Sequence, residues 1–179
     1  MNLLSRLSNQ RLLQCIFLTL TIGFVPELLA DDPITPEVAP ASSEGKESMM
    51  AIRLPADWEI DLFSAEPDIA NVVAFDFDHQ GRIYVCETFR QNQGVTDNRG
   101  HDDRWLLADL AAETVQDRID YHRELLAGEA ITYEQHDDRV RRIEDTDGDG
   151  IADTSLVVAS GFNQLEEGTG ASILWRPSG

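Results

Sequence analysis

The stretch that most constrains the fold of this chain is 145–153, with the sequence Asp-Thr-Asp-Gly-Asp-Gly-Ile-Ala-Asp. The segments on either side, 140–143 and 156–159, have the apolar pattern of strands rather than helices. Asp and Gly are typical of tight turns, because Asp side chains accept bonds from nearby N–H groups and Gly tolerates a positive φ. The stretch therefore predicts a turn that connects two strands.

The same stretch also has the composition of a cation site, because Ca²⁺ binds about six to eight oxygen ligands. It resembles the first nine positions of an EF-hand loop, with Gly150 at the sharp turn and the Ile151 carbonyl as a backbone ligand. Leu156 stands where an EF-hand has a bidentate Glu, so a sensor EF-hand is not expected. Two interpretations remain: a turn held by its own hydrogen bonds, or a Ca²⁺ site. The predicted ligands of that site are Asp145, Asp147, Asp149, Ile151 and Asp153.

The charge of the chain restricts its partners. The formal net charge is −19, from 33 acidic and 14 basic residues, and Lys46 is the only lysine. Nucleic-acid backbones are bound by clustered Lys and Arg, so no nucleic-acid partner is expected. An acidic protein that accommodates cations fits this composition better.

Residues 1–30 have the pattern of a signal peptide. Arg6 and Arg11 precede an apolar run, 12–25, that is short for a membrane span, and Ala30 fits the position before a cleavage site. The chain is therefore expected to be exported, to the periplasm or outside the cell. An uncleaved N-terminal membrane anchor is the alternative.

Cleavage would leave Cys86 as the single cysteine, because Cys15 lies inside the apolar run. One cysteine can form neither an internal disulfide nor a Cys-x-x-Cys-His haem attachment, so no haem site is expected in this chain. Cys86 lies in the strand-like run 82–89, where a small buried residue is the expected role and a reactive thiol is the alternative.

The N-terminal part of the mature chain is predicted to be a linker followed by strands. Residues 31–51 are rich in Pro, Glu, Ser and Ala, which is typical of a disordered acidic linker, and the folded domain is expected over 52–179. Apolar and polar residues alternate over 58–63, as in a half-buried strand. Residues 71–78 and 82–89 predict a β-hairpin buried on both faces.

A helical insertion of two helices is expected over about 102–128, after a polar loop at 90–101. Asp102 or Asp103 can cap the first helix, and Thr114–Asp117 has the pattern of a capping box for the second. Gly128 is the expected end of the second helix.

Strand patterns return after the helices, over 139–144 and 155–160, and 171–175 has the pattern of the start of another strand. Four antiparallel strands followed by a new inner strand are typical of a β-propeller blade. One blade cannot bury its own faces. The sequence therefore predicts a mainly β fold: the first blade or blades of a β-propeller with a two-helix insertion, incomplete in this chain, with the remaining blades as its partners.

Several motifs together carry a resemblance to a known family. Phe75–Asp78 with Gly81–Val85 is similar to the first blade of bacterial glucose/sorbosone-dehydrogenase-like propellers. Over about 54–175 the chain resembles the N-terminal propeller of large secreted planctomycete proteins, labelled membrane-bound dehydrogenases or haem-binding Cys-x-x-Cys-His proteins. The stretches that carry this resemblance are 62–67, 87–90, 94–101, 145–153 and 161–166.

This resemblance implies a secreted oxidoreductase that acts on sugars or alcohols, with a quinone or a downstream haem as acceptor. A cytochrome c domain of the longer protein is then a further partner, and the isolated chain is expected to be inactive. By analogy, His101 would act as the base and Arg90 or Arg99 would hold an anionic quinone. Alternatively, His101 helps to cap the following helix and the arginines pair with nearby Asp residues.

A second function stays open beside the oxidoreductase. It is a non-catalytic, calcium-stabilised propeller module that binds a glycan or a protein.

Overall fold

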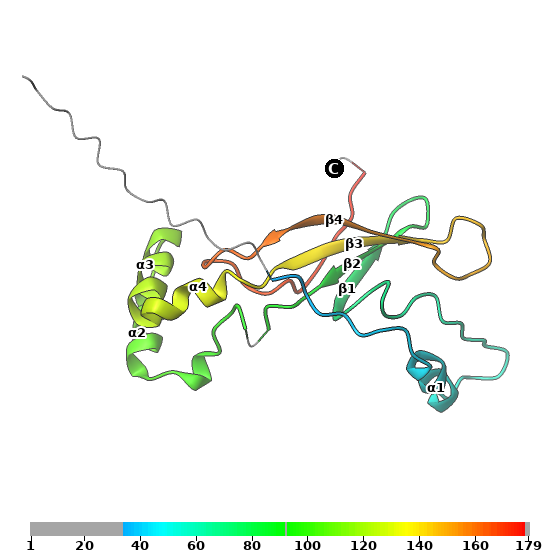
Figure 1. The fold of residues 1–179 in the computed structure, drawn as a ribbon, viewed down its shortest axis with the longest axis horizontal. Helices are drawn as coiled ribbons and strands as arrows, with labels where there is room; N and C mark the ends of the chain where they lie inside the picture. Colours follow the sequence, from blue (N-terminus) through cyan, green and yellow to red (C-terminus); the bar gives the residue numbers. More distant parts are fainter. Residues whose placement is uncertain (1–33, 92, 178–179) are drawn as a thin grey trace, which may run out of the picture.

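The computed structural model describes residues 34–91 and 93–177. Its centre is a four-stranded antiparallel sheet with the strand order β1-β2-β3-β4 (Figure 1). The prediction of a mainly β fold is thereby confirmed. The strands are β1 (Val72–Phe77), β2 (Ile83–Glu87), β3 (Asp138–Glu144) and β4 (Thr154–Phe162).

The first two strands form the predicted hairpin. The Asp78 carboxylate accepts hydrogen bonds from the backbone N–H groups of Gln80 (2.8 Å) and Arg82 (3.0 Å). Gly81 has a φ of 82°, as expected from its place in the turn. The register pairs Phe75 with Val85.

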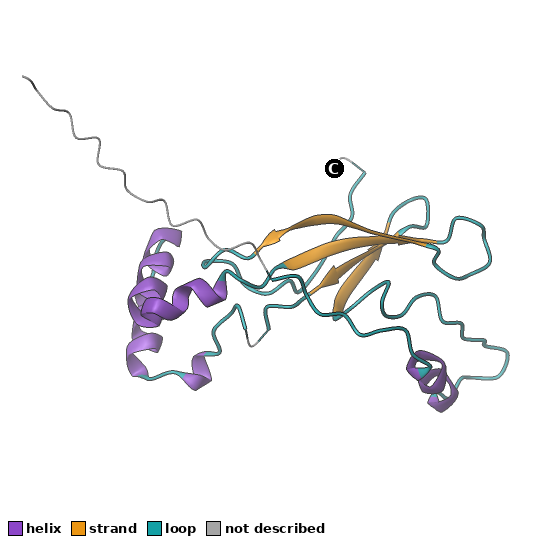
Figure 2. Cartoon of the chain, viewed as in Figure 1, coloured by secondary structure: helices purple, strands orange, loops and turns teal. Residues whose placement is uncertain are grey.

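Helices fill the connection between β2 and β3 and lie at one end of the sheet (Figure 2). Asp102 caps the first helix by accepting from two backbone N–H groups, and Thr114 and Asp117 form the predicted capping box. Buried Trp105, Tyr121, Leu126 and Leu165 form the core of this end. The helical elements are η1 (Asn98–Gly100), α2 (Asp103–Ala111), α3 (Val115–Leu126), η2 (Ala127–Glu129) and α4 (Ala130–Tyr133).

The insertion therefore continues to Tyr133, beyond the predicted end at Gly128. The C-cap of α3 is Ala127, which takes a positive φ of 48°. The second helix thus ends next to Gly128, as predicted, and the separate short elements η2 and α4 extend the helical segment to Tyr133.

The predicted linker and two predicted strands need correction. Glu44–Ala51 forms α1 inside the predicted disordered linker, where the Ser43 hydroxyl donates to Glu47 and acidic residues occupy the first turn. Residues 58–63 and 171–175 are not strands. An alternating pattern becomes a strand only beside a backbone that can pair with it. Instead, the Phe63 carbonyl accepts from Ala152, and the Trp175 N–H donates to the Asp76 carboxylate.

Burial of both hairpin strands on both faces is also wrong. Val85 and Cys86 of β2 are buried, but Phe75 and Phe77 of β1 are 61% and 52% exposed. β1 is an edge strand of the sheet, so it has a neighbouring strand on one side only. Its apolar face is left open in the part of the chain that the structure describes.

The connections that do not carry helices lie at the opposite end of the sheet. In Figure 1 the turn between β1 and β2 and the loop between β3 and β4 extend away from α2, α3 and α4. Within residues 34–91 and 93–177, no helix is long and apolar enough to cross a membrane. The predicted signal peptide lies outside the described residues.

Candidate functional site

The loop between β3 and β4 brings three of the predicted metal ligands together. Carboxylate oxygens of Asp145, Asp147 and Asp149 all lie within 4.8 Å of one another. Gly148 and Gly150 have φ angles of 83° and 89°, a conformation that L side chains rarely adopt, and they let the loop close around the three carboxylates.

Backbone N–H groups hold these carboxylates in place. The two oxygens of Asp145 accept from the N–H groups of Gly148 (2.6 Å) and Gly150 (2.9 Å). Bonds from Gly150 and Gly148 lower the pKa of Asp145, because N–H donors favour the charged form. Asp149 in turn accepts from the N–H of Ile151 (2.8 Å). The loop is therefore arranged by its own backbone.

The other two predicted ligands are placed differently. Asp153 accepts from the N–H (3.1 Å) and hydroxyl (2.7 Å) of Thr146, and the Thr146 hydroxyl bond is the largest cause of its lowered pKa. Ile151 is at the surface, with a 55% exposed side chain. The group of converging carboxylates thus does not include Asp153, and the Ile151 carbonyl stays a predicted backbone ligand.

The three converging carboxylates suit a hard cation such as Ca²⁺ in chemistry. Each can offer an oxygen, and among the described residues no Lys, Arg or His forms an ion pair with any of them. Three neighbouring anions repel one another unless a cation is bound between them. Their full set of ligands would have to be completed by backbone carbonyls and water.

The predicted catalytic base, His101, lies at the other end of the sheet. Its ring stacks on the buried Trp105 ring, with centroids 4.1 Å apart and an interplanar angle of 15°. It lines a hollow of about 290 Å³ beside the start of α2, together with Arg104 and Leu125. His101 therefore packs against the first turns of α2, which agrees better with the alternative role at the start of a helix than with a catalytic base.

Arg99 makes an exposed ion pair. Its guanidinium lies 2.6 Å from the carboxylate of Asp97, and both side chains are at the surface. The Arg99 side-chain bond is the main reason that the pKa of Asp97 falls to about 2. This pairing with a nearby Asp is the structural alternative that the sequence offered for the arginines.

Arg90 is completely buried, and its guanidinium binds main-chain carbonyls. Nη1 donates to Glu167 (3.2 Å) and Gly168 (3.1 Å), and Nη2 donates to Gly94 (2.8 Å) and Gln164 (2.9 Å). Burial lowers the pKa of Arg90. The structure therefore gives this side chain a role in joining loops.

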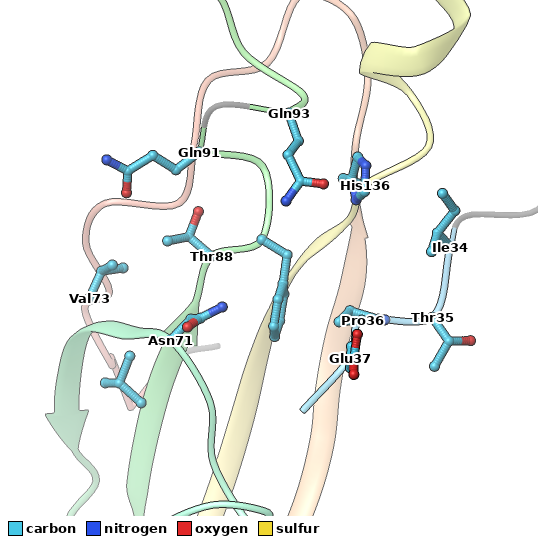
Figure 3. A pocket seen from close by; sticks show the side chains of 12 residues that line it. Ile34, Thr35, Pro36, Glu37, Asn71, Val73, Thr88, Gln91, Gln93 and His136 are labelled. Carbon is cyan, nitrogen blue, oxygen red and sulfur yellow. The ribbon is translucent and has the colours of Figure 1, made fainter. Parts of the chain in front are cut away.

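Two of the predicted catalytic residues line different hollows. His101 lines the hollow beside α2, and Arg99 lines another of about 520 Å³ with Thr96 and Thr169. A third hollow, of about 710 Å³, lies where the loop after β2 meets β1 and the N-terminal segment (Figure 3). It contains none of the predicted catalytic residues.

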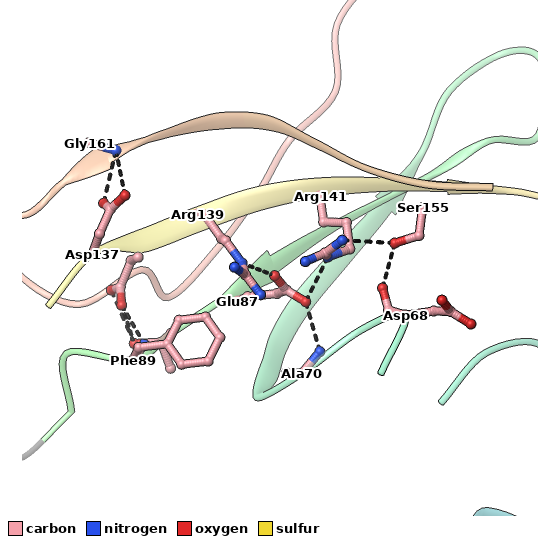
Figure 4. Close-up of polar contacts among 11 residues, drawn as sticks. Asp68, Ala70, Glu87, Phe89, Asp137, Arg139, Arg141, Ser155 and Gly161 are labelled. Atoms are coloured by element: carbon pink, nitrogen blue, oxygen red, sulfur yellow. Dashed lines mark hydrogen bonds and ion pairs between the residues drawn. The ribbon is translucent and has the colours of Figure 1, made fainter. Parts of the chain in front are cut away.

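Two buried carboxylates at the helical end were missed by sequence reasoning. Glu87 is fully buried and accepts from the Ala70 N–H (2.7 Å) and the guanidiniums of Arg139 and Arg141, as Figure 4 shows. Arg139 and Arg141 alternate along β3 opposite β2, and this pattern was a usable signal. An Arg on an inner face of a sheet requires an acidic partner.

Asp138 is the second buried carboxylate and is only 1% exposed. It accepts from the backbone N–H groups of Phe89 (2.6 Å), Arg90 (3.0 Å) and Gly170 (2.6 Å), and from the hydroxyl of Thr88 (3.0 Å). The sequence analysis had no signal for this role, because the donors are distant in the chain.

Comparison with known proteins gives a family and no named relative. A family model described as "Domain of unknown function (DUF7133)" matches residues 44–167. The search of curated proteins and the search of solved structures return no match. The matched range begins at the first residue of α1 and includes the whole sheet.

Proposed function

Since the chain belongs to the family of the domain of unknown function DUF7133, we propose that it is a calcium-stabilised β-propeller module that binds other molecules. The observation that carries the calcium part is the convergence of Asp145, Asp147 and Asp149 within 4.8 Å. His101 stacks on Trp105, Arg99 pairs with Asp97 and Arg90 binds main-chain carbonyls, and these structural contacts favour a binding role over a catalytic one.

The role of the cation follows from the place of the loop. The loop joins β3 to β4, and it contacts the preceding segment through the Ala152 N–H, which donates to the Phe63 carbonyl (2.8 Å). A cation that binds only the folded chain stabilises it by mass action, by about 2.7 kcal/mol when its free concentration is 100 times Kd. Ca²⁺ would therefore stabilise both the β3–β4 connection and the segment packed against it.

A calcium titration monitored by thermal unfolding tests this proposal. Ca²⁺ is expected to raise Tm of the wild-type chain in a saturable way, and Asp147→Ala is expected to abolish the increase. Asp120→Ala is the matched control, because it removes the same charge from an exposed position on α3. An unchanged calcium response in Asp147→Ala would overturn the assignment of the ligands.

The propeller part of the proposal is supported by the exposed apolar residues of the sheet. Phe75 and Phe77 of the edge strand β1 are more than half exposed, as is Leu156 of the other edge strand, β4. Exposed apolar edge strands favour association with further β structure. We propose further sheets of the same kind, the neighbouring blades, as the partners that cover them.

Sedimentation of the isolated chain tests the propeller part. Association of the chain in solution is the expected result. A monomer that unfolds in one cooperative transition would contradict the need for neighbouring blades.

The oxidoreductase is the second proposal, and it rests on the family resemblance rather than on a constellation of side chains. In it, the longer protein is exported and oxidises sugars or alcohols, with a quinone or a cytochrome c domain as acceptor. Turnover of a sugar panel with a quinone by the longer protein is expected. Glycan binding without turnover would favour the binding module instead.

A further inference from the structure

The hollow of about 710 Å³ shown in Figure 3 has the size of a small-molecule site, since such sites span about 300–1,000 Å³. It lies at the helical end of the sheet, away from the β3–β4 loop that holds Asp145, Asp147 and Asp149 (the acidic loop). Four segments surround it: the N-terminal segment, the start of β1, the loop after β2 and the residues before β3. Its lining residues are Ile34–Glu37, Asn71–Val73, Thr88, Phe89, Gln91, Gln93 and His136.

Buried groups behind the hollow hold residues 89–90 and 93–94 of the loop after β2. The Asp138 carboxylate holds the N–H groups of Phe89 and Arg90, and the Arg90 carbonyl accepts from the N–H groups of Gln93 (2.9 Å) and Gly94 (2.8 Å). The buried Arg90 guanidinium then ties this turn to the chain around Gln164. A ligand would therefore meet backbone at Phe89, Arg90, Gln93 and Gly94 that is already held by hydrogen bonds, which reduces the entropy lost on binding.

Backbone hydrogen bonds also connect the N-terminal segment and the start of β1 to the rest of the hollow. The Ile34 N–H donates to the Gln135 carbonyl (2.7 Å), next to His136, and the Thr88 N–H donates to the Asn71 carbonyl (3.2 Å). Figure 3 shows Gln93 and His136 above the hollow, Asn71 and Thr88 on one side of it, and Thr35–Glu37 on the other.

Three amide side chains of the hollow have no hydrogen-bond partner among the described residues, whereas the Thr88 hydroxyl is bonded to Asp138. In the described residues, the side-chain amides of Asn71, Gln91 and Gln93 make no hydrogen bond, and all three residues are exposed. Each amide offers two donors and one acceptor, so it can bind a hydroxyl group in either sense. His136 adds a ring that donates and accepts, and Glu37 adds an acceptor.

The charge of the lining selects against anions. It contains one carboxylate, Glu37, and no Lys or Arg, and the whole chain has a formal net charge of −19. Phosphate and carboxylate ligands require cationic partners. Apolar surface is also present, from Val73, Pro36 and the Phe89 ring. The hollow therefore suits a neutral ligand that has many hydroxyl groups and an apolar C–H face.

We infer that this hollow is a binding site for a neutral saccharide, in which the amides of Asn71, Gln91 and Gln93 bind hydroxyl groups. The inference rests on the proposed function as a binding module and names its site and its ligand class. It uses none of the residues of the acidic loop, so the two sites can be tested separately.

Isothermal titration of the full chain with neutral tetrasaccharides, cellotetraose and xylotetraose, tests this inference. At least one probe is expected to bind, and Gln91→Ala/Gln93→Ala is expected to weaken that binding at least tenfold. Gln116→Ala is the matched control, because it removes an exposed glutamine from α3 and leaves the hollow unchanged. Tetragalacturonate, the anionic probe, is expected to bind more weakly.

The inference is overturned if neither neutral probe binds, if the double variant binds as the wild type does, or if the anionic probe or an uncharged extended peptide binds more tightly. The calcium response of Tm is measured on the same samples. If no saccharide binds but the calcium response is normal, only the proposal of a saccharide site in the hollow is contradicted. If a saccharide binds but Tm does not respond to calcium, only the proposal of a calcium site in the acidic loop is contradicted.

Discussion

The acidic side chains at the two ends of the sheet are held by contacts of very different range. In the β3–β4 loop, the side chains bond to groups at most seven positions away, as Asp153 does to Thr146. At the helical end, Asp138 accepts from groups 48 to 50 positions before it and 32 positions after it. A local arrangement can be predicted from neighbouring residues in the sequence. A long-range arrangement forms only when the chain folds, so it cannot be predicted in this way.

The energetics of the two ends are expected to differ in the same way. The carboxylates of the loop are largely at the surface, where water and salt screen them. Glu87 and Asp138 are buried, so a lost partner leaves polar groups without water or a bond. Substitutions at the helical end should therefore affect stability more than substitutions in the loop.

The largest expected effect is that of Glu87→Ala. It leaves Arg139, Arg141 and the Ala70 N–H without their acceptor in a buried place, and breaking such a pair costs about 3–5 kcal/mol. Urea unfolding followed by tryptophan fluorescence measures the change. Glu144→Ala is the control, because its 3.8 Å ion pair to Arg142 is partly exposed and contributes about 0–1 kcal/mol.

If Glu87→Ala does not fold, Glu87→Gln gives the same test in a milder form, since the amide keeps one acceptor. Equal losses of stability in Glu87→Gln and Glu144→Ala would contradict the contrast between the two ends.

An intermediate effect is expected for Gly170→Ala. A Cβ at this position would lie 2.6 Å from the Sγ of Cys86, so the packing must shift, at a cost of about 1–3 kcal/mol. Gly168→Ala is the matched control, because a Cβ there meets nothing within 4 Å. Urea midpoints compare the two variants, and Cys86→Ala should restore part of the stability that Gly170→Ala loses. No difference between Gly170→Ala and Gly168→Ala would argue against close packing of this segment on β2.

The smallest expected effect is the pH dependence from His122. This side chain is 2% exposed, its Nδ1 lies 2.8 Å from the Arg118 carbonyl, and burial lowers its pKa below the ordinary 6.5. The unfolded chain therefore binds a proton more readily than the folded one. The stability from neutral His122 is present above pH 6.5 and is lost as the pH falls through the lower folded pKa.

Urea unfolding between pH 7 and pH 5 measures this dependence. The decrease in stability toward pH 5 should be smaller in His122→Gln than in the wild type, while His79→Gln should keep it. An identical pH profile in all three chains would show that His122 does not titrate on unfolding.

What the sequence could predict follows the same division by range. The turn at Gly81, the cap at Asp102 and the capping box of Thr114 and Asp117 each depend on neighbouring residues, and the structure confirms them. The convergence of Asp145, Asp147 and Asp149 has the same origin. By contrast, the alternation over 58–63 did not produce a strand, since a strand depends on a partner elsewhere in the chain.

The hollow and the buried Asp138 could not be predicted for the same reason. Asp138 is buried because the fold brings Phe89 and Gly170 to it and excludes water. Arg90 carried a catalytic hypothesis because it follows a strand, and the fold surrounds it with carbonyls from Gly94, Gln164 and Gly168. No local sequence pattern predicts these contacts between residues that are distant in the sequence.

The central claim is that the β3–β4 loop is a locally encoded calcium site, and residue-resolved NMR of the labelled chain tests it most directly. On titration with Ca²⁺, the amide signals of Gly148 and Gly150 should shift and saturate at one equivalent, because their N–H groups bond to the Asp145 carboxylate that would bind the cation. Signals of Gln91 and Gln93, at the far end of the sheet, should stay in place. Unchanged Gly148 and Gly150 signals at millimolar Ca²⁺ would contradict the claim.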